Sequence, residues 1–357
     1  MFEVRGPLRS RFEAKGKLHH GIASNLQPLA SGVLSEQLSA KSYELFMYRQ
    51  FYNLKEKPFE ITPDPNFLFL SESHREALAH LVYAARERKG FAVVTGEVGT
   101  GKTTLVQTFL AQLNGKVKTA YIFNPKLSST DFLRYICEDL GIKEEKHSKG
   151  QYIAQLHELL LEYYSRDEQV ILIIDEAQSL PTPLLEEVRL LTNLETPKSK
   201  LLQVMLIGQP ELNTVLNSHE FRQLKQRVGL RYHMQPLSEE DTNKYIEKRL
   251  TTAGAVDTRL FTSKALKEIY HYSNGIPRLI NIVCDNALLA GYALGHKVIG
   301  DRTIRDVTRQ LEGKPVQGKR NISRIVIGVL LGLIIVVGLL IWWGANNSTV
   351  VIPWFNN

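Results

Sequence analysis

The sequence predicts an α/β protein: a parallel sheet flanked by helices, followed by an all-helical domain and one C-terminal transmembrane helix. Short apolar segments alternate with helical segments between Phe91 and Met234, which is typical of a parallel sheet covered on both faces. Strand signals stop after Pro236, and an uninterrupted apolar run follows near the C-terminus. The 357-residue length allows about two domains.

The first part of the chain differs in character from the remainder. Residues 1–46 show no clear periodicity, and they lack the basic start and apolar stretch of a signal peptide. We expect a poorly ordered leader or a translation start placed too early. Residues 48–70 are rich in aromatic side chains and proline, and proline prevents a long helix there.

The α/β part begins with a helix. Ser71 or Ser73 is expected to cap it, and the second serine has a glutamate three residues later, the spacing of a capping box. Among the later segments, 170–174 and 202–207 show no polar alternation, as expected for strands buried on both faces. The predicted strands are 91–95, 119–123, 170–174, 202–207 and 230–234, and the predicted helices are 71–88, 102–113, 131–140, 152–164, 184–194 and 221–226.

Helices alone are expected after the sheet. Ser238 and Thr262 are suitable N-caps for two of them. We therefore predict an α/β core over 47–236 and a helical lid domain over 237–312. The predicted helices are 239–251, 263–272, 277–294 and 301–311.

The apolar run at 325–343 contains nineteen residues without a charge. At about 1.5 Å per residue it just spans a hydrocarbon core of about 30 Å. The basic juxtamembrane linker, 313–324, contains four lysines and arginines, and no charged residue follows the run. The positive-inside rule then places the large N-terminal part in the cytoplasm and the short tail, 344–357, outside.

Charge and cysteine content exclude several functions. The net charge is +7, but residues 47–313 contribute only +1 of it, which argues against a nucleic-acid-binding surface on the body. Cys137 and Cys284 lie far apart, and neither they nor the ten histidines show metal-ligand spacing. We therefore predict no zinc site, and expect the cysteines to be small core residues in a reducing compartment.

A glycine-rich segment carries the clearest chemistry. GEVGTGKT matches G-x-x-x-x-G-K-[ST], follows an apolar strand and opens a helix. Glycines let backbone N–H groups curl around phosphate, and the helix N-terminus adds positive potential. Lys102 would reach the β- and γ-phosphates of ATP, and Thr103 would ligate Mg²⁺. The predicted nucleotide site comprises Gly96, Glu97, Val98, Gly99, Thr100, Gly101, Lys102, Thr103 and Thr104.

Two acidic residues complete this prediction. Asp175 and Glu176 end a buried strand, 73 residues after Lys102. Ligands bind at the carboxyl ends of strands in open α/β sheets, so Asp175 would hold Mg²⁺ and Glu176 would act as general base. Gln209 follows another buried strand. If that strand lies between the other two, Gln209 would point to the γ-phosphate; a loop or cap role is an equal alternative.

Several other polar residues are weaker candidates. One of Arg222, Arg227 and Arg231 could act as an arginine finger on a neighbouring subunit, whereas a solvated basic face is the alternative. Arg278 opens a helix of the lid domain and could fold back onto the phosphates. For His74 we favour a capping role over a contact to nucleotide.

These residues resemble the AAA+ ATPases among the P-loop NTPases, and more narrowly the general secretion pathway protein A (ExeA-like) family. The resemblance runs over roughly 47–312. Its specific marks are Tyr52-Asn53-Leu54, Pro58-Phe59, Thr62-Pro63-Asp64-Pro65, Leu70-Ser71 with His74, Asp175-Glu176-Ala177-Gln178, Gly208-Gln209-Pro210-Glu211-Leu212 and Asn274-Gly275-Ile276-Pro277-Arg278.

The resemblance implies roles for individual residues. Lys102 and Thr103 would be Walker A, and the Asp-Glu pair Walker B. Gln209 would be sensor 1, Arg227 the best finger candidate and Arg278 sensor 2. The family implies a homo-oligomeric ATPase of the bacterial inner membrane that assists assembly of secretion, pilus or polysaccharide-export machinery.

Longer members continue into a peptidoglycan-binding domain, which the fourteen residues of 344–357 cannot form; this argues against a direct cell-wall role. Two alternatives remain open. One is a DNA-associated regulator similar to transposition-helper ATPases. The other is a low-turnover switch that uses ATP to order a partner surface.

Overall fold

The computed structural model describes residues 48–62, 64–123, 127–142, 148–197, 199–314, 333, 335–340 and 342. The predicted leader, the predicted tail and most of the predicted basic linker lie outside these residues. The chain divides into two compact units, Met1–Ile304 and Arg305–Asn357.

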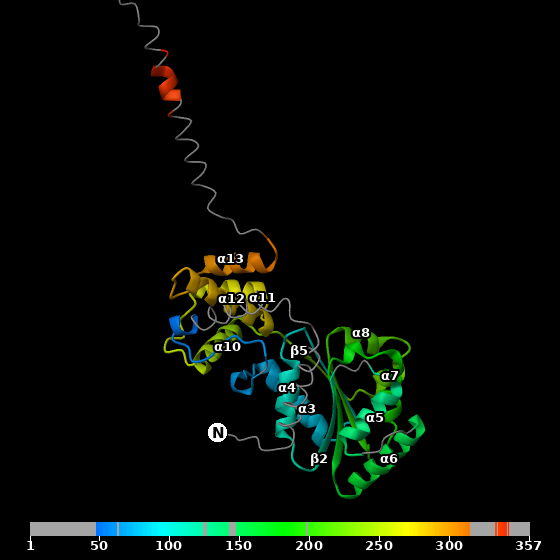
Figure 1. Ribbon diagram of the computed structural model, residues 1–357. Coiled ribbons are helices and arrows are strands. Elements are labelled where there is room, and N and C mark those ends of the chain that lie inside the picture. The colour runs from blue at the N-terminus through cyan, green and yellow to red at the C-terminus, as the bar shows by residue number, and fades with distance from the viewer. Residues whose placement is uncertain are drawn as a thin grey trace, which may run out of the picture. The chain divides into compact units, whose positions relative to one another are not determined.

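Five parallel strands form the sheet of the first unit, in the order β2-β3-β4-β1-β5 (Figure 1). The prediction of a parallel sheet is confirmed. The order places β4 between β3 and β1, which is the arrangement that the prediction for Gln209 requires. The strands are β1 Phe91–Gly96, β2 Val117–Ile122, β3 Gln169–Ile174, β4 Leu202–Gly208 and β5 Leu230–Met234.

Side chains of the central strands alternate between two apolar layers. Ile171 and Ile173 of β3 pack on the face covered by α3 and α4, whereas Leu172 and Ile174 pack on the face covered by α5 to α9 (Figure 1). Because both faces are covered, β3 and β4 are mostly apolar; Gln169 opens β3, and Gln203 of β4 is a buried polar exception. The helices of this part are α3 Glu72–Arg86, α4 Lys102–Gln112, α5 Ser129–Asp139, α6 Lys149–Ser165, α7 Thr182–Leu191, α8 Glu211–Asn217 and α9 Arg222–Arg227.

The structure decides between the two predicted caps and adds one helix that was not predicted. The helix α3 is capped by Ser71, whose hydroxyl accepts from the His74 N–H, and not by Ser73. The Ser73 hydroxyl instead accepts from the backbone N–H of Gln235 at 2.9 Å, which ties α3 to the end of β5. The helix α8 was not predicted, because seven residues are too few for a repeated apolar period.

The four helices predicted after Pro236 are present, at α10 Glu239–Thr252, α11 Ser263–Ser273, α12 Pro277–Ala293 and α13 Asp301–Leu311. The segment before α3 packs against α10 and α12. The guanidinium of Arg249 in α10 donates to the carbonyls of Pro58 and Glu60 and lies over the ring of Phe67. Tyr48 donates to Asp285 of α12 at 3.0 Å.

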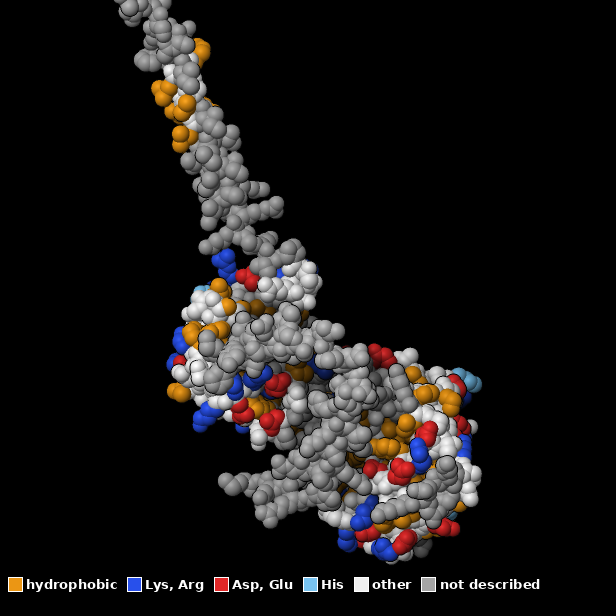
Figure 2. Space-filling view, in the orientation of Figure 1, with side chains coloured by type: hydrophobic (Ala, Val, Ile, Leu, Met, Phe, Trp, Pro, Cys, Tyr) orange, Lys and Arg blue, Asp and Glu red, His pale blue; other side chains and the backbone are white. Residues whose placement is uncertain are grey.

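The second unit carries the predicted membrane span. Within 325–343, the described residues are 333, 335–340 and 342; they are helical and exposed, and most of their side chains are apolar (Figure 2). The rest of the predicted span lies outside the described residues. Within the part of the chain that the structure describes, no helix combines the length and apolar character needed to cross a membrane.

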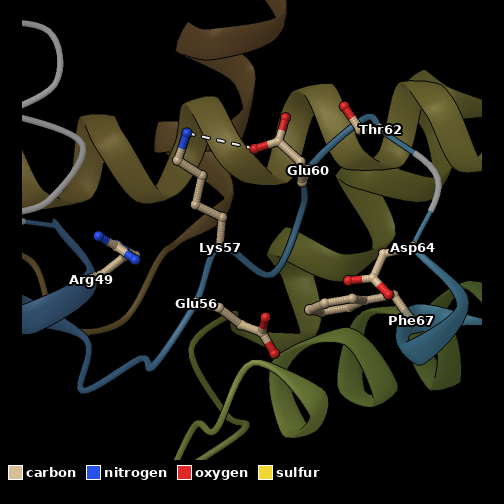
Figure 3. A pocket seen from close by; sticks show the side chains of 7 residues that line it. All are labelled: Arg49, Glu56, Lys57, Glu60, Thr62, Asp64 and Phe67. Atoms are coloured by element: carbon tan, nitrogen blue, oxygen red, sulfur yellow. Dashed lines mark ion pairs between the residues drawn. The ribbon is translucent and has the colours of Figure 1, made fainter. Parts of the chain in front are cut away.

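A cavity of about 470 Å³ lies in the segment before α3 (Figure 3). It has both acidic and basic walls, and none of its residues belongs to the predicted phosphate site. Its lining residues are Arg49, Glu56, Lys57, Glu60, Thr62, Asp64 and Phe67.

Candidate functional site

The glycine-rich loop joins β1 to α4. Gly99 and Gly101 have φ of +83° and +95°, a backbone region that L side chains rarely adopt. Lys102 is 5% exposed, and its Nζ donates to the carbonyls of Gly96 at 2.8 Å and Glu97 at 2.9 Å. Burial lowers the pKa of Lys102, against the raising effect of the nearby carboxylates. Two backbone carbonyls of the loop therefore hold the Lys102 ammonium group.

Asp175 lies opposite this loop, at the end of β3, and is fully buried. Its Oδ2 accepts from the Thr103 hydroxyl at 2.8 Å and from the Tyr121 hydroxyl at 3.1 Å. Its Oδ1 accepts from the Glu176 N–H at 2.9 Å. Burial raises the pKa of Asp175, while the bonds from Thr103 and Glu176 oppose that rise. The neighbouring hydroxyl and carboxylate are oxygen ligands of the kind that Mg²⁺ takes.

Glu176 adopts a left-handed conformation, with φ of +53°. Such a conformation costs a non-glycine residue about 1–3 kcal/mol and is concentrated at functional sites. Its Oε2 accepts from the side-chain amides of Gln178 at 2.6 Å and Gln209 at 3.2 Å. The structure thus brings Gln209 to the predicted general base, from the strand between β3 and β1.

His74 supports the loop from the α3 side and is 5% exposed. Its Nε2 lies 2.9 Å from the Thr100 carbonyl, and its Nδ1 lies 2.6 Å from the Ser71 hydroxyl. A carbonyl can only accept, so Nε2 carries the proton and donates. The predicted capping role describes only part of what His74 does. Its backbone N–H donates to the capping Ser71 hydroxyl, and its imidazole also supports the phosphate-binding loop.

These groups fit a magnesium nucleotide. A Cβ at Gly99 would lie 2.6 Å from the Arg278 Cβ, and one at Gly101 would lie 3.0 Å from the His74 Nε2. The loop therefore has room only for glycine at both positions. Lys102 supplies a cation for phosphate, and the Thr103–Asp175 pair supplies oxygen ligands for the metal.

Comparison with known proteins agrees with this geometry. Residues 85–216 match the family described as "AAA domain". Over 301 residues the chain is 43% identical to general secretion pathway protein A of Aeromonas hydrophila. The chain is an AAA+ protein related to general secretion pathway protein A. The match covers 84% of this chain and 54% of that protein, so the chain spans about half the length of that relative.

More distant similarities concern part of the chain or the fold alone. The Mu-like prophage FluMu DNA transposition protein B of Haemophilus influenzae is 28% identical over 42% of this chain and 50% of its own length. Among solved structures, Cdc6p from Pyrobaculum aerophilum has a TM-score of 0.56 at 20% identity, over 71% of this chain and 70% of that one. The Aeropyrum pernix ORC2 protein has a TM-score of 0.53 at 18% identity, over 72% of each chain.

The start of α12 borders the glycine-rich loop. The Arg278 N–H donates to the Gly99 carbonyl at 3.3 Å, and Arg278 is exposed. Gly275 lies just before α12, and its carbonyl accepts from the Leu237 N–H at 2.9 Å. Arg278 thus lies beside the phosphate-binding loop, although its guanidinium stays a proposed sensor.

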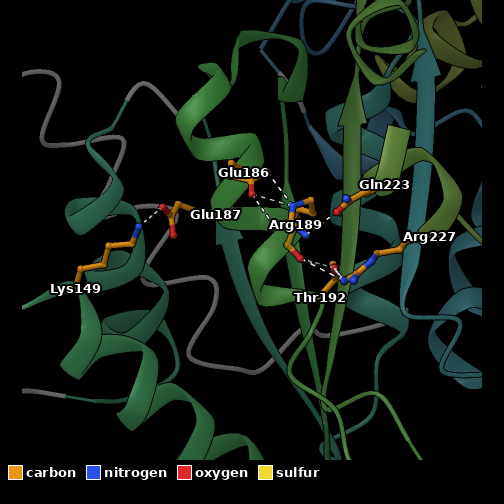
Figure 4. Close-up of polar contacts among 7 residues, drawn as sticks. All are labelled: Lys149, Glu186, Glu187, Arg189, Thr192, Gln223 and Arg227. Carbon is orange, nitrogen blue, oxygen red and sulfur yellow. Dashed lines mark hydrogen bonds and ion pairs between the residues drawn. The ribbon is translucent and has the colours of Figure 1, made fainter. Parts of the chain in front are cut away.

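The structure does not bring the other arginine candidates to this chain's own site. Arg227 donates to the Thr192 hydroxyl and the Arg189 carbonyl, at the C-terminal end of α7 (Figure 4). A cation there complements the negative end of the helix. Arg222 and Arg231 are not bonded to this site: the first opens α9, and the second lies in β5, paired with Val93. A role of any of these on a neighbouring subunit stays a prediction.

The remaining loop residues occupy peripheral positions: Glu97 and Val98 are exposed, and Thr104 is half-buried in the first turn of α4. Two contacting residues were missed. Tyr121 lies in an edge strand, and Gln178 follows the acidic pair within Asp175-Glu176-Ala177-Gln178. The signal for Gln178 was its spacing: two residues after Glu176, on a turn, its amide can reach back to that carboxylate.

Proposed function

We propose that the chain is a membrane-anchored AAA+ ATPase that drives or regulates assembly of a bacterial envelope system, such as type II secretion, pilus or exopolysaccharide export. One observation carries the hydrolytic part. The predicted catalytic residues lie together at the carboxyl ends of β1 and β3: they are Lys102, the Thr103–Asp175 pair and Glu176. The name of the Aeromonas relative supports the secretion part.

The chemistry follows from the residues. Backbone N–H groups of the loop bind the phosphates, and Lys102 exchanges its carbonyl partners for phosphate oxygens. Thr103 and Asp175 would hold Mg²⁺, which neutralises charge on the phosphate oxygens when bound. Glu176 takes a proton from the water that attacks the γ-phosphorus, as the bond to the ADP oxygen breaks. Gln209 orients the Glu176 carboxylate.

Other residues are proposed to act through subunit and lid contacts. Arg278 lies on the helix that meets the phosphate-binding loop through the Gly99 carbonyl, so it can sense the γ-phosphate if the lid closes. We propose a homo-oligomer in which Arg227 leaves the end of α7 and reaches a neighbour's nucleotide.

Membrane anchoring through 325–343 is proposed from sequence. The run is apolar, and its basic residues lie on the N-terminal side alone, so the ATPase part would be cytoplasmic and the C-terminus outside the inner membrane. Retention of the full chain in the membrane fraction after a high-salt wash supports this anchor. Release of the full chain by the same wash contradicts it.

A second candidate is a regulator that acts with DNA. The similarity to a DNA transposition protein of Haemophilus influenzae favours it, whereas the +1 charge over residues 47–313 argues against it. DNA binding that weakens steeply with salt would support this candidate. A low-turnover switch is the third, and it predicts ATP binding with little steady-state hydrolysis.

The partner experiment uses the full-length Glu176→Gln variant, which should bind ATP without hydrolysing it. The variant is held in ATP, extracted from membranes in mild detergent, and its co-purifying proteins are identified beside a Lys102→Ala control. Secretin, pilus or polysaccharide-export components retained by Glu176→Gln alone support the proposal. DNA or a recombinase retained instead overturns it.

A further inference from the structure

One side-chain amide joins the ends of the two strands that carry the hydrolytic residues. The Gln178 Nε2 donates to the Glu176 Oε2 at 2.6 Å, and its Oε1 accepts from the backbone N–H of Gln209 at 2.9 Å. Gln178 is half-buried. Both ends of its amide are therefore used, one on the carboxylate after β3 and one on the backbone after β4.

The local backbone fixes Gln178 in this place. The short 3-10 helix Ala177–Ser179 follows Glu176 directly. The Ser179 hydroxyl donates to the Glu176 carbonyl at 2.7 Å and closes that turn. The turn brings the Gln178 side chain back over the residue two positions earlier.

The neighbouring strand leaves room for this amide because it ends in glycine. A Cβ at Gly208 would lie 2.8 Å from the Gln178 Oε1 and 3.3 Å from its backbone N. Any side chain at this position would displace the amide or the turn. Gly208 has no positive φ, so close neighbours are what favour glycine here: Gln178 is the nearest, and Leu212 Cδ2 would lie 3.2 Å from the Cβ.

The two amides that reach Glu176 bind the same oxygen. Gln178 and Gln209 both donate to Oε2, so a second carboxylate oxygen, Oε1, is left to face the attacking water. Two donors also hold the carboxylate against rotation. A general base misplaced by about 1 Å can lose about 100-fold in rate.

We propose that Gln178 is a positioning residue for hydrolysis: it fixes the Glu176 carboxylate relative to the end of β4, and Gly208 provides the space for it. This inference rests on the proposed ATPase function. It adds no chemical step, since the proton still passes from water to Glu176. Because Gln178 acts through Glu176 and not on the nucleotide or the metal, its effect falls on turnover and not on nucleotide affinity.

The test compares full-length Gln178→Ala, Gly208→Ala and the double variant with the wild type and with Gly115→Ala. A Cβ at Gly115 meets nothing within 4 Å, so that variant is the matched control. Steady-state ATP hydrolysis gives kcat and KM, and nucleotide fluorescence gives the Kd for Mg-ATP. We expect Gln178→Ala and Gly208→Ala each to lower kcat about tenfold or more without changing Kd.

The double variant separates this mechanism from a general loss of structure. Once the amide is absent, the closest contact of the added Cβ is gone, while those with Leu212 Cδ2 at 3.2 Å and with the Gln178 backbone N at 3.3 Å remain. The double variant should therefore lose less kcat than the two single losses combined. Gly208→Ala keeps the Gln178 side chain. It therefore still tests the inference if Gln178→Ala does not fold.

Three results overturn the inference. One is a Gln178→Ala kcat within twofold of the wild type. Another is an increase in the Kd for Mg-ATP by the same factor as the decrease in kcat. The third is additive losses in the double variant. A wild-type chain that does not hydrolyse Mg-ATP contradicts the proposed function and this inference with it, whereas wild-type turnover that depends on Glu176 but not on Gln178 contradicts the inference alone.

Discussion

Replacing His74 with alanine tests whether a buried imidazole holds the phosphate-binding loop. His74 is 5% exposed and Thr100 is fully buried. The substitution removes the hydrogen bond to the Thr100 carbonyl, at 2.9 Å, and the contact with the Ser71 hydroxyl at 2.6 Å. It also leaves a void beside Gly101, where a Cβ would lie 3.0 Å from the imidazole.

The magnitude follows from these contacts. A buried carbonyl left without a donor costs about 1–3 kcal/mol, and the void left by the ring adds to this cost. We expect His74→Ala to lower the free energy of unfolding by about 2–4 kcal/mol. Because the loop loses its support, the affinity for Mg-ATP should fall as well.

The assay is denaturant unfolding of the full-length chain without nucleotide, followed by titration with Mg-ATP. His219 is exposed, so His219→Ala is the matched control and should unfold at the wild-type midpoint. If His74→Ala unfolds at the same denaturant concentration as the control and binds Mg-ATP equally well, the supporting role of His74 is refuted.

The same residue gives a pH dependence of defined sign. Burial lowers the pKa of His74, against smaller raising effects of the Thr100 carbonyl and of Asp241. Above the unfolded pKa of about 6.5, His74 is neutral in both states. Below that pKa, the unfolded chain takes up the proton first, so the free energy of unfolding decreases as the pH decreases. The wild-type advantage over His74→Gln should therefore shrink as the pH decreases from about 7 to about 5.

Three further predictions concern the glycine-rich loop and the segment just before α12. Lys102→Ala should abolish detectable Mg-ATP binding by fluorescence titration, whereas retained affinity would contradict the phosphate role. Gly99→Ala should weaken Mg-ATP binding at least about tenfold, because φ is +83° and the new Cβ would lie 2.6 Å from that of Arg278; unchanged Kd would contradict this. Gly275→Ala should lower the thermal unfolding midpoint more than Gly115→Ala does, because its Cβ would lie 1.9 Å from the Leu237 carbonyl oxygen; equal midpoints would contradict this.

Much of the fold could be predicted because its signals are local. Most residues of the buried strands β3 and β4 are apolar. Two of the helices after the sheet begin at serine or threonine caps, Ser238 and Thr262. The strand order was not predictable in this way, since it depends on long-range pairing. It was stated as a condition for the role of Gln209, and the structure meets that condition.

The site was predictable to the extent that its chemistry follows a spacing along the chain. The Walker A segment and the Asp175–Glu176 pair were found in this way. The choice between Ser71 and Ser73 as the cap was open, because it depends on which hydroxyl the distant Gln235 N–H reaches. The contacts of Arg227, and that of Gln178 with the Gln209 backbone, were missed for the same reason: these partners lie far along the chain, in other elements. The contact of Gln178 with Glu176, two residues away, is the part that spacing does indicate.

The central claim, ATP hydrolysis with Glu176 as general base, is tested most directly with the full-length chain and its Glu176→Gln variant in Mg-ATP. The measurement is the rate of phosphate release beside the Kd for Mg-ATP. We predict that the variant keeps the wild-type affinity and loses at least about 100-fold in kcat. Phosphate release by Glu176→Gln at the wild-type rate would contradict the assignment of Glu176 as the base.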